Sequence, residues 1–218
     1  MKRFLSRLSG LLTHGVRVLV VVLTVSYLVA VIGSVLQVYD LYRWLALAPA
    51  AFWKGCLWQV FTYPLLPEGL INFIFNTIAI VWLGRQLERE WSRRELWSYC
   101  LLTATGAGAA KILLSSWNGF PLVGTAGIVF GMLVAWLRLF GHKKVVFGSV
   151  WETTILRAGL LMIAVGLLLM LFTAGLIDTL VMFCGGLVGW LYLSLRWKLN
   201  REQPSQVAES GRIRRLEL

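Results

Sequence analysis

The chain has 218 residues, of which 58% are hydrophobic and only 14% are charged, and its mean hydropathy is +0.75. Soluble domains carry about 25% charged residues, so this composition excludes an ordinary soluble domain and indicates a membrane protein. The formal net charge of +11 does not predict nucleic-acid binding, because no soluble domain is left to carry it. The charge instead indicates membrane topology and contact with anionic lipid headgroups.

Long apolar stretches predict an all-α integral membrane fold, because the apolar residues run continuously instead of alternating and only helices or closed barrels cross lipid. About 20 apolar residues span a bilayer. The first stretch is too long for a cleaved signal sequence, so we expect it to remain as an anchor. The six predicted helices form one domain over residues 18–195 and lie at about 18–36, 68–87, 96–114, 122–140, 155–172 and 176–195.

The remaining segments are assigned from their polarity. Residues 1–17 form a short cytoplasmic N-terminus. Residues 37–67 mix several tryptophans with few charges, which is typical of a loop lying in the membrane interface. Residues 196–218 form a basic cytoplasmic tail, and we expect this tail to be disordered from Asn200 onward.

The placement of basic residues predicts the orientation of the helices. Of the 21 lysines and arginines, all but Arg43, Lys54 and Lys111 fall on one side of the predicted bundle. The positive-inside rule therefore places both termini in the cytoplasm. The three cysteines, Cys56, Cys100 and Cys184, follow no metal or disulfide spacing, so we expect no metal site and no cofactor.

Two glycine-rich stretches fall inside predicted helices. Gly127 and Gly131 lie four residues apart in the fourth helix, and Gly185 and Gly189 lie four residues apart in the sixth. This spacing puts both glycines of a pair on one face and lets another backbone approach closely. The spacing alone indicates only that these helices pack tightly against a neighbour.

The order of these stretches and of other short motifs is more specific. From residue 52 to 192, the chain resembles the rhomboid family of intramembrane serine proteases. The segment 58–64 resembles the family's Trp-Arg-x-x-Thr-Tyr lead into its second helix. The other matching motifs are Asn72-x-x-x-Asn76 for His-x-x-x-Asn, Gly84-x-x-x-Glu88, Gly124-x-x-Gly127-x-x-x-Gly131 around the nucleophile, and Phe183-Cys184-Gly185-Gly186 for His-x-x-Gly.

The resemblance implies a serine nucleophile, a histidine general base and polar groups that hold the oxyanion. In this chain the nucleophile position is Ala126, the base position is Phe183 and the second-helix histidine position is Asn72; only Asn76 is kept. Protease chemistry by the family mechanism is therefore not expected. The chain is identified as a catalytically inactive member of the family, a pseudoprotease.

No other residue offers an obvious replacement. Thr125 points about 100° around the helix from Ala126. Lys111 and Ser115 have the spacing of a dyad, but a lysine reaching toward the external interface is the simpler interpretation. Asp178 has no second in-membrane aspartate to pair with, and the only histidines, His14 and His142, are predicted on the cytoplasmic side.

The retained residues then require structural roles. We expect the six glycines of the fourth and sixth helices to let these helices pack together, and Ala126 to face Phe183 across the former active site. Glu88 is expected to accept hydrogen bonds or to pair with nearby arginines. Asn72 and Asn76 share one face, which marks either a residual polar cavity or an interhelical hydrogen bond.

The leading functional hypothesis is a rhomboid-like pseudoprotease of a bacterial inner membrane that binds transmembrane partner proteins without cleaving them. Inactive relatives such as iRhoms and derlins handle membrane clients, and the resemblance implies a similar role. One alternative is an accessory subunit of a larger membrane complex, which the aromatic and small-residue helix faces would suit. Another is a serine endopeptidase with residual activity by unrecognised chemistry.

Overall fold

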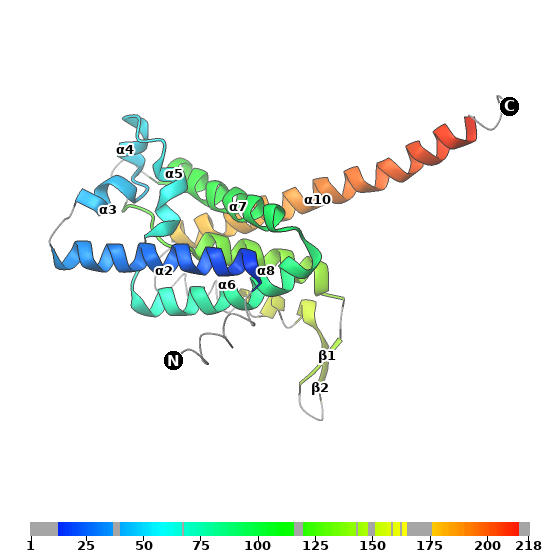
Figure 1. Ribbon diagram of the computed structural model, residues 1–218, viewed down its shortest axis with the longest axis horizontal. Coiled ribbons are helices and arrows are strands. Elements are labelled where there is room, and N and C mark those ends of the chain that lie inside the picture. The colour runs from blue at the N-terminus through cyan, green and yellow to red at the C-terminus, as the bar shows by residue number, and fades with distance from the viewer. Residues whose placement is uncertain are drawn as a thin grey trace.

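The computed structural model describes residues 13–36, 40–66, 68–115, 120–142, 144–147, 151–157, 159–161, 163–164 and 176–213. Its long helices lie side by side as a bundle, with the shorter helices at one end (Figure 1). The long helices are α2 (His14–Val35), α6 (Leu70–Glu90), α7 (Arg93–Leu114), α8 (Ala126–Phe140) and α10 (Leu176–Ile213). Below we call the two ends of the bundle the Ala126 end and the Glu88 end.

The bundle core is apolar and centred on α7 and α8. Fully buried side chains from five helices meet there, among them Val16, Ile80, Leu96, Met132 and Leu193. The outer faces of the helices are also apolar, as expected where lipid replaces water around the bundle. On α2, for example, Val25 is 53% exposed.

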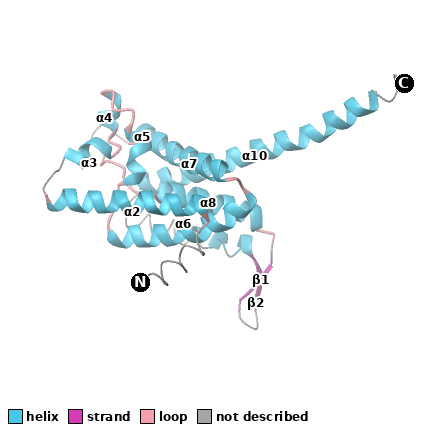
Figure 2. Cartoon of the chain, viewed as in Figure 1, coloured by secondary structure: helices cyan, strands magenta, loops and turns pink. Residues whose placement is uncertain are grey.

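Short helices cover the Ala126 end of the bundle (Figure 2). They are α3 (Asp40–Leu45), α4 (Pro49–Trp53), α5 (Gln59–Thr62) and the 3-10 turn η1 (Tyr63–Leu65). Leu47 exchanges two backbone hydrogen bonds with Leu122, of 3.0 and 2.8 Å. This bridge ties the predicted interfacial loop to the segment that leads into α8.

The helical bundle of the prediction is confirmed, with shifted boundaries. Within the described residues, three helices are long and apolar enough to cross a membrane by length and composition: His14–Val35, Leu70–Glu90 and Leu176–Arg196. Helix α8 has 15 residues and begins four residues later than predicted. Most of the predicted fifth helix, 155–172, falls outside the described residues.

Two features differ from the sequence prediction. A short antiparallel hairpin, β1 (Lys144–Phe147) with β2 (Trp151–Thr154), follows α8 in what was expected to be a plain loop. The tail expected to be disordered from Asn200 is instead helical, because α10 continues to Ile213 without a break at Pro204. This extension projects away from the bundle (Figure 1).

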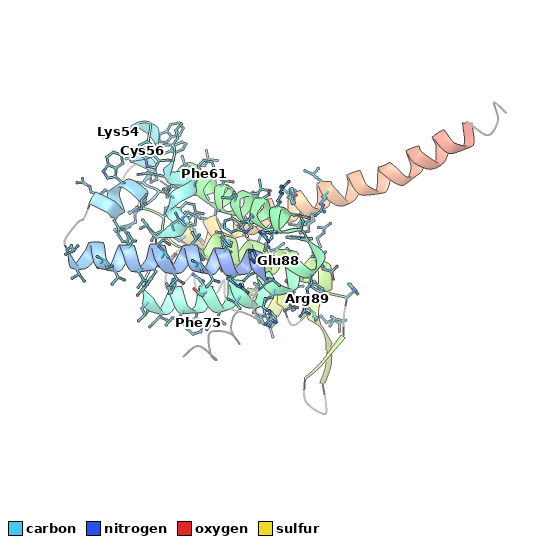
Figure 3. The ribbon with its side chains drawn as sticks, in the orientation of Figure 1. Lys54, Cys56, Phe61, Phe75, Glu88 and Arg89 are labelled. Atoms are coloured by element: carbon cyan, nitrogen blue, oxygen red, sulfur yellow. The ribbon has the colours of Figure 1, made fainter. Side chains whose placement is uncertain are left out.

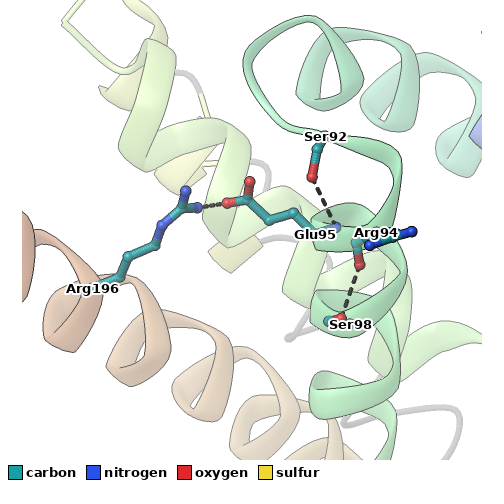
Figure 4. Close-up of polar contacts among 5 residues, drawn as sticks. All are labelled: Ser92, Arg94, Glu95, Ser98 and Arg196. Atoms are coloured by element: carbon teal, nitrogen blue, oxygen red, sulfur yellow. Dashed lines mark hydrogen bonds and ion pairs between the residues drawn. The ribbon is translucent and has the colours of Figure 1, made fainter.

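Ion pairs join the antiparallel helices α7 and α10 at both ends. At the Ala126 end, Lys111 Nζ lies 2.6 Å from Asp178 Oδ1. At the other end, Glu95 of α7 pairs with Arg196 of α10, while the Glu95 amide donates to Ser92 Oγ at the start of α7 (Figure 4). The expectation that Lys111 reaches out to the interface is wrong, because this residue is only 3% exposed.

Candidate functional site

The glycine motifs meet on one face of α7. A methyl group built at Gly127 would lie 2.9 Å from Ala107 Cβ, and one built at Gly131 would lie 2.5 Å from Thr103 Cγ2. A methyl at Gly185 would lie 3.1 Å from the same Ala107 Cβ and 3.5 Å from the Gly127 carbonyl oxygen. The predicted contact between the fourth and sixth helices is therefore confirmed, and α7 also packs against both glycine faces.

Two buried tyrosines form hydrogen bonds where α8 and α10 pack against α7. Tyr99 Oη donates to the Gly131 carbonyl at 2.8 Å, and Tyr63 Oη donates to the Ala104 carbonyl at 2.8 Å. Tyr63 belongs to the motif at 58–64 that carries the family resemblance. Tyr99 was not identified from the sequence, where only the helical spacing of Tyr99, Thr103 and Ala107 signals a shared face. Each hydroxyl satisfies its donor inside the bundle, which fixes the helices around the α8 start.

Ala126 is the first residue of α8 and is partly buried. Gly124, two residues earlier, has φ of +94°, a backbone conformation that favours glycine. The chain thus turns sharply just before α8, and the turn presents the helix N-terminus to a small niche. At the nucleophile position itself there is only a methyl group.

Glu68, which precedes α6, is partly exposed and lines the niche beside this turn. A methyl at Gly124 would touch Glu68 Oε1 and would lie 2.7 Å from the Glu68 carboxyl carbon. Only about 10 Å³ of space remains among the lining residues, which include Leu66, Asn76 and Thr125, enough for about one water. The sequence prediction did not identify Glu68 as part of the site.

Asn72 and Asn76 relate to this niche in different ways. Asn72 is exposed and its Nδ2 donates to Glu68 Oε2 at 3.0 Å, whereas Asn76 is half-buried and lines the niche. Burial of the carboxylate raises the pKa of Glu68, the Asn72 hydrogen bond lowers it and the charge of Asp178 raises it. Desolvation is the largest of these effects, so the pKa of Glu68 lies above its ordinary value.

Phe183 does not fill this niche. Its side chain is 48% exposed and lines a separate apolar groove of about 360 Å³ with Phe130, Leu187 and Trp190. The expectation that Phe183 faces Ala126 across the former active site is therefore wrong. Phe183 and Gly185 are two residues apart in α10, so they lie about 200° apart around the helix. Gly185 faces α7, and Phe183 therefore lies on nearly the opposite side of α10.

Glu88 has a structural role at the opposite end of the bundle (Figure 3). Its carboxylate accepts hydrogen bonds from the amides of Gly15 at 2.7 Å and Val16 at 3.0 Å, and from the Thr13 hydroxyl. A methyl at Gly84 would lie 2.7 Å from Val16 Cγ2. The Gly-x-x-x-Glu motif therefore packs and hydrogen-bonds the start of α2 against α6. The expectation that Glu88 accepts hydrogen bonds is confirmed.

The histidines are far from the α8 start. His14 begins α2 beside the Glu88 contact, and His142 follows the end of α8, a 15-residue helix that is about 22 Å long. Among the described residues, no group of three or more His, Cys, Asp or Glu side chains is placed to hold a metal ion.

The family model described as the Rhomboid domain matches residues 54–199. No curated protein matches the chain. The matched range contains Glu68, Ala126 and the glycine contacts described above.

Proposed function

The chain belongs to the rhomboid family, and on this premise we propose that it is a pseudoprotease that binds transmembrane segments of partner proteins without cleaving them. The observation that carries the proposal is the state of the niche at the start of α8. A methyl group stands at the nucleophile position, Ala126, and the Glu68 carboxylate is packed against Gly124.

Both features argue against peptide hydrolysis. A methyl group has no lone pair with which to attack a carbonyl, and neither Phe183 nor Asn72 accepts a proton as a histidine does. A tetrahedral intermediate also needs hydrogen-bond donors around its oxyanion. A carboxylate beside the Gly124–Ala126 turn places a like charge where these donors are needed.

The retained packing supports a binding role. The glycine contacts of α8 and α10 with α7, the tyrosine hydrogen bonds and the Glu88 contact do not depend on a nucleophile. They keep a membrane-embedded scaffold whose outer faces are apolar, as on α2 and α6. In lipid, helix association relies on close packing and hydrogen bonds, so partners that span the membrane fit this surface best.

We further propose six membrane spans with both termini in the cytoplasm of a bacterium, in its inner membrane. The basic residues at the Glu88 end, among them Arg85, Arg89, Arg93 and Arg94, support this orientation through the positive-inside rule. The Ala126 end would then open to the external side. Cysteine accessibility to a membrane-impermeant reagent, after single cysteines are placed at each end, tests the orientation.

The inactivity is tested by restoring the missing groups. We expect purified wild-type protein, and Ala126→Ser combined with Phe183→His, to show no fluorophosphonate labelling and no cleavage of transmembrane reporters. The double variant is expected to fail because Asn72 departs from the family pattern and because the Glu68 carboxylate lies against Gly124. Strong labelling of wild-type protein would contradict the proposal, and strong cleavage by the double variant would show that the site is otherwise intact.

The binding role is tested by crosslinking in the native membrane, followed by purification. We expect membrane-spanning polypeptides to co-purify in substoichiometric amounts, as clients do. A fixed-stoichiometry complex that survives detergent would instead support an accessory subunit. Recovery of no membrane polypeptide would contradict both roles.

A further inference from the structure

Two basic residues at the Ala126 end have no role in the account so far. Arg43, Lys54 and Lys111 are the three that depart from the charge asymmetry of the chain. Lys111 is explained by its ion pair with Asp178. Within the described part of the chain, neither Arg43 nor Lys54 forms a salt bridge, and both are exposed.

Arg43 and Lys54 line the same cavity. It has a volume of about 350 Å³ and lies between α3, α4 and the loop before α8. Its walls are made by small side chains such as Ala46 and Ala50, and by Pro121. Small side chains leave room for a ligand of several heavy atoms, while the two cations give the cavity a positive charge.

The surroundings place this cavity at the membrane boundary. Trp44 is 62% exposed, Trp53 58% and Trp58 41%, and all three belong to the α3–α5 segment that forms the cavity. Trp44 and Trp58 stack with ring centroids 5.7 Å apart. Exposed tryptophans gather at the level of lipid headgroups, and Figure 3 shows Lys54 and Phe61 at this same end of the bundle.

We propose that this cavity binds the phosphate headgroup of an anionic phospholipid. Arg43 and Lys54 would donate charge-assisted hydrogen bonds to the phosphate oxygens, and the small-residue walls accept the rest of the headgroup. The exposed tryptophans favour a lipid over a free anion, because they anchor the cavity mouth where headgroups are concentrated. The leucine bridge from Leu47 to Leu122 connects this site to the turn before Ala126.

Photo-crosslinking from a labelled lipid tests the site. The full chain is placed in nanodiscs of phosphatidylcholine containing phosphatidylglycerol with a diazirine in its headgroup, and the adducts are mapped by peptide mass spectrometry. We expect adducts between residues 42 and 54. Arg43→Gln combined with Lys54→Gln should reduce these adducts about tenfold, because two charge-assisted contacts are lost.

Matched controls separate the possible outcomes. Arg89→Gln combined with Arg94→Gln removes two exposed charges at the Glu88 end and should leave the adducts at 42–54 unchanged. The single variants Arg43→Gln and Lys54→Gln give partial loss if the double variant does not fold. Equal labelling of the double variant, equal labelling by diazirine phosphatidylcholine, or loss of the adducts on adding millimolar glycerol phosphate would each overturn the phospholipid assignment.

Discussion

The ion pair between Lys111 and Asp178 offers a sharp test of the helix packing. Lys111 is buried, whereas the Asp178 side chain is 34% exposed. Asp178→Asn keeps the side-chain shape but removes the charge. The Lys111 ammonium then stays in the bundle without a counter-charge, and we expect the free energy of unfolding to fall.

The magnitude follows from the exposure of the two partners. Removing one partner of a fully buried ion pair costs about 3–5 kcal/mol. Here the cost is reduced because water screens the aspartate and because Lys111, near the end of α7, can extend toward the interface. We expect a loss of about 2 kcal/mol, or a fall in Tm of about 4–8 °C by the scaling of chains this long.

The assay is thermal unfolding of purified protein in detergent, with Glu90→Gln as control because Glu90 is an exposed acid at the opposite end. Lys111→Met combined with Asp178→Asn removes both charges and should recover at least half of the loss, since no unpaired ammonium remains. The reasoning is refuted if Asp178→Asn costs no more than Glu90→Gln, or if the double variant is as unstable as the sum of the single ones.

Three further predictions concern the glycine junction, the Glu88 contact and the niche. Gly131→Ala should cost about 1–3 kcal/mol of stability and should lower Tm more than Gly185→Ala. The methyl added at Gly131 would lie 2.5 Å from Thr103, whereas the methyl added at Gly185 would lie 3.1 Å from its nearest neighbour, Ala107. Glu88→Gln should destabilise the protein by about 1–2 kcal/mol through loss of charge-assisted bonds, with faster hydrogen exchange at the start of α2. Glu68→Gln should flatten the fall in Tm with rising pH, because a raised pKa means that the folded state holds its proton at a pH where the unfolded state has released it.

Each of these has a contrary result. Equal Tm values for the two glycine variants would mean that the junction relaxes around a methyl group. Unchanged hydrogen exchange at the start of α2 in the Glu88→Gln variant would show that α2 does not need the hydrogen bonds to Glu88 in order to begin at His14. In the Glu68 case, stability rising with pH between the ordinary glutamate pKa and the higher folded value would contradict the sign, since it requires a lowered pKa.

The sequence predicted the helices well and their ends poorly. Apolar length is a local property, so four of the predicted spans coincide with α2, α6, α7 and α10 to within a few residues at most ends. The ends depend on distant contacts. Helix α2 starts at His14, before the apolar run, because Glu88 from α6 accepts the hydrogen bonds of its first amides.

The start of α8 shows the same limit at the site itself. The segment around Leu122 is apolar enough to be helical, but its backbone bonds to Leu47 and Gly124 turns with positive φ, so the helix begins at Ala126. The glycine spacing predicts a close contact between the fourth and sixth helices, and the structure has this contact at Gly127 and Gly185. Glu68 was missed because nothing in the sequence around it indicates that its carboxylate reaches a glycine 56 positions later.

Contacts between helices cannot be found from the sequence of either helix. The sequence around Lys111 offers only Ser115 as a neighbour, although Asp178 lies at the matching height of the antiparallel helix α10. Phe183 was placed by motif position, and its helical phase relative to Gly185 turns it toward the groove with Phe130. Which residues pair between two helices, and which way a side chain faces around its helix, can be determined only from the three-dimensional arrangement.

We propose that the chain binds transmembrane partners without cleaving them. The most direct measurement is the intact mass of the polypeptides captured by photo-crosslinking in the native membrane, with a parallel capture by the Asp178→Asn variant as a check on the folded scaffold. We expect full-length, membrane-spanning partners whose recovery falls with the stability of that scaffold. Captured fragments that end within their own transmembrane segments would contradict it, because they would show that the chain cleaves what it binds.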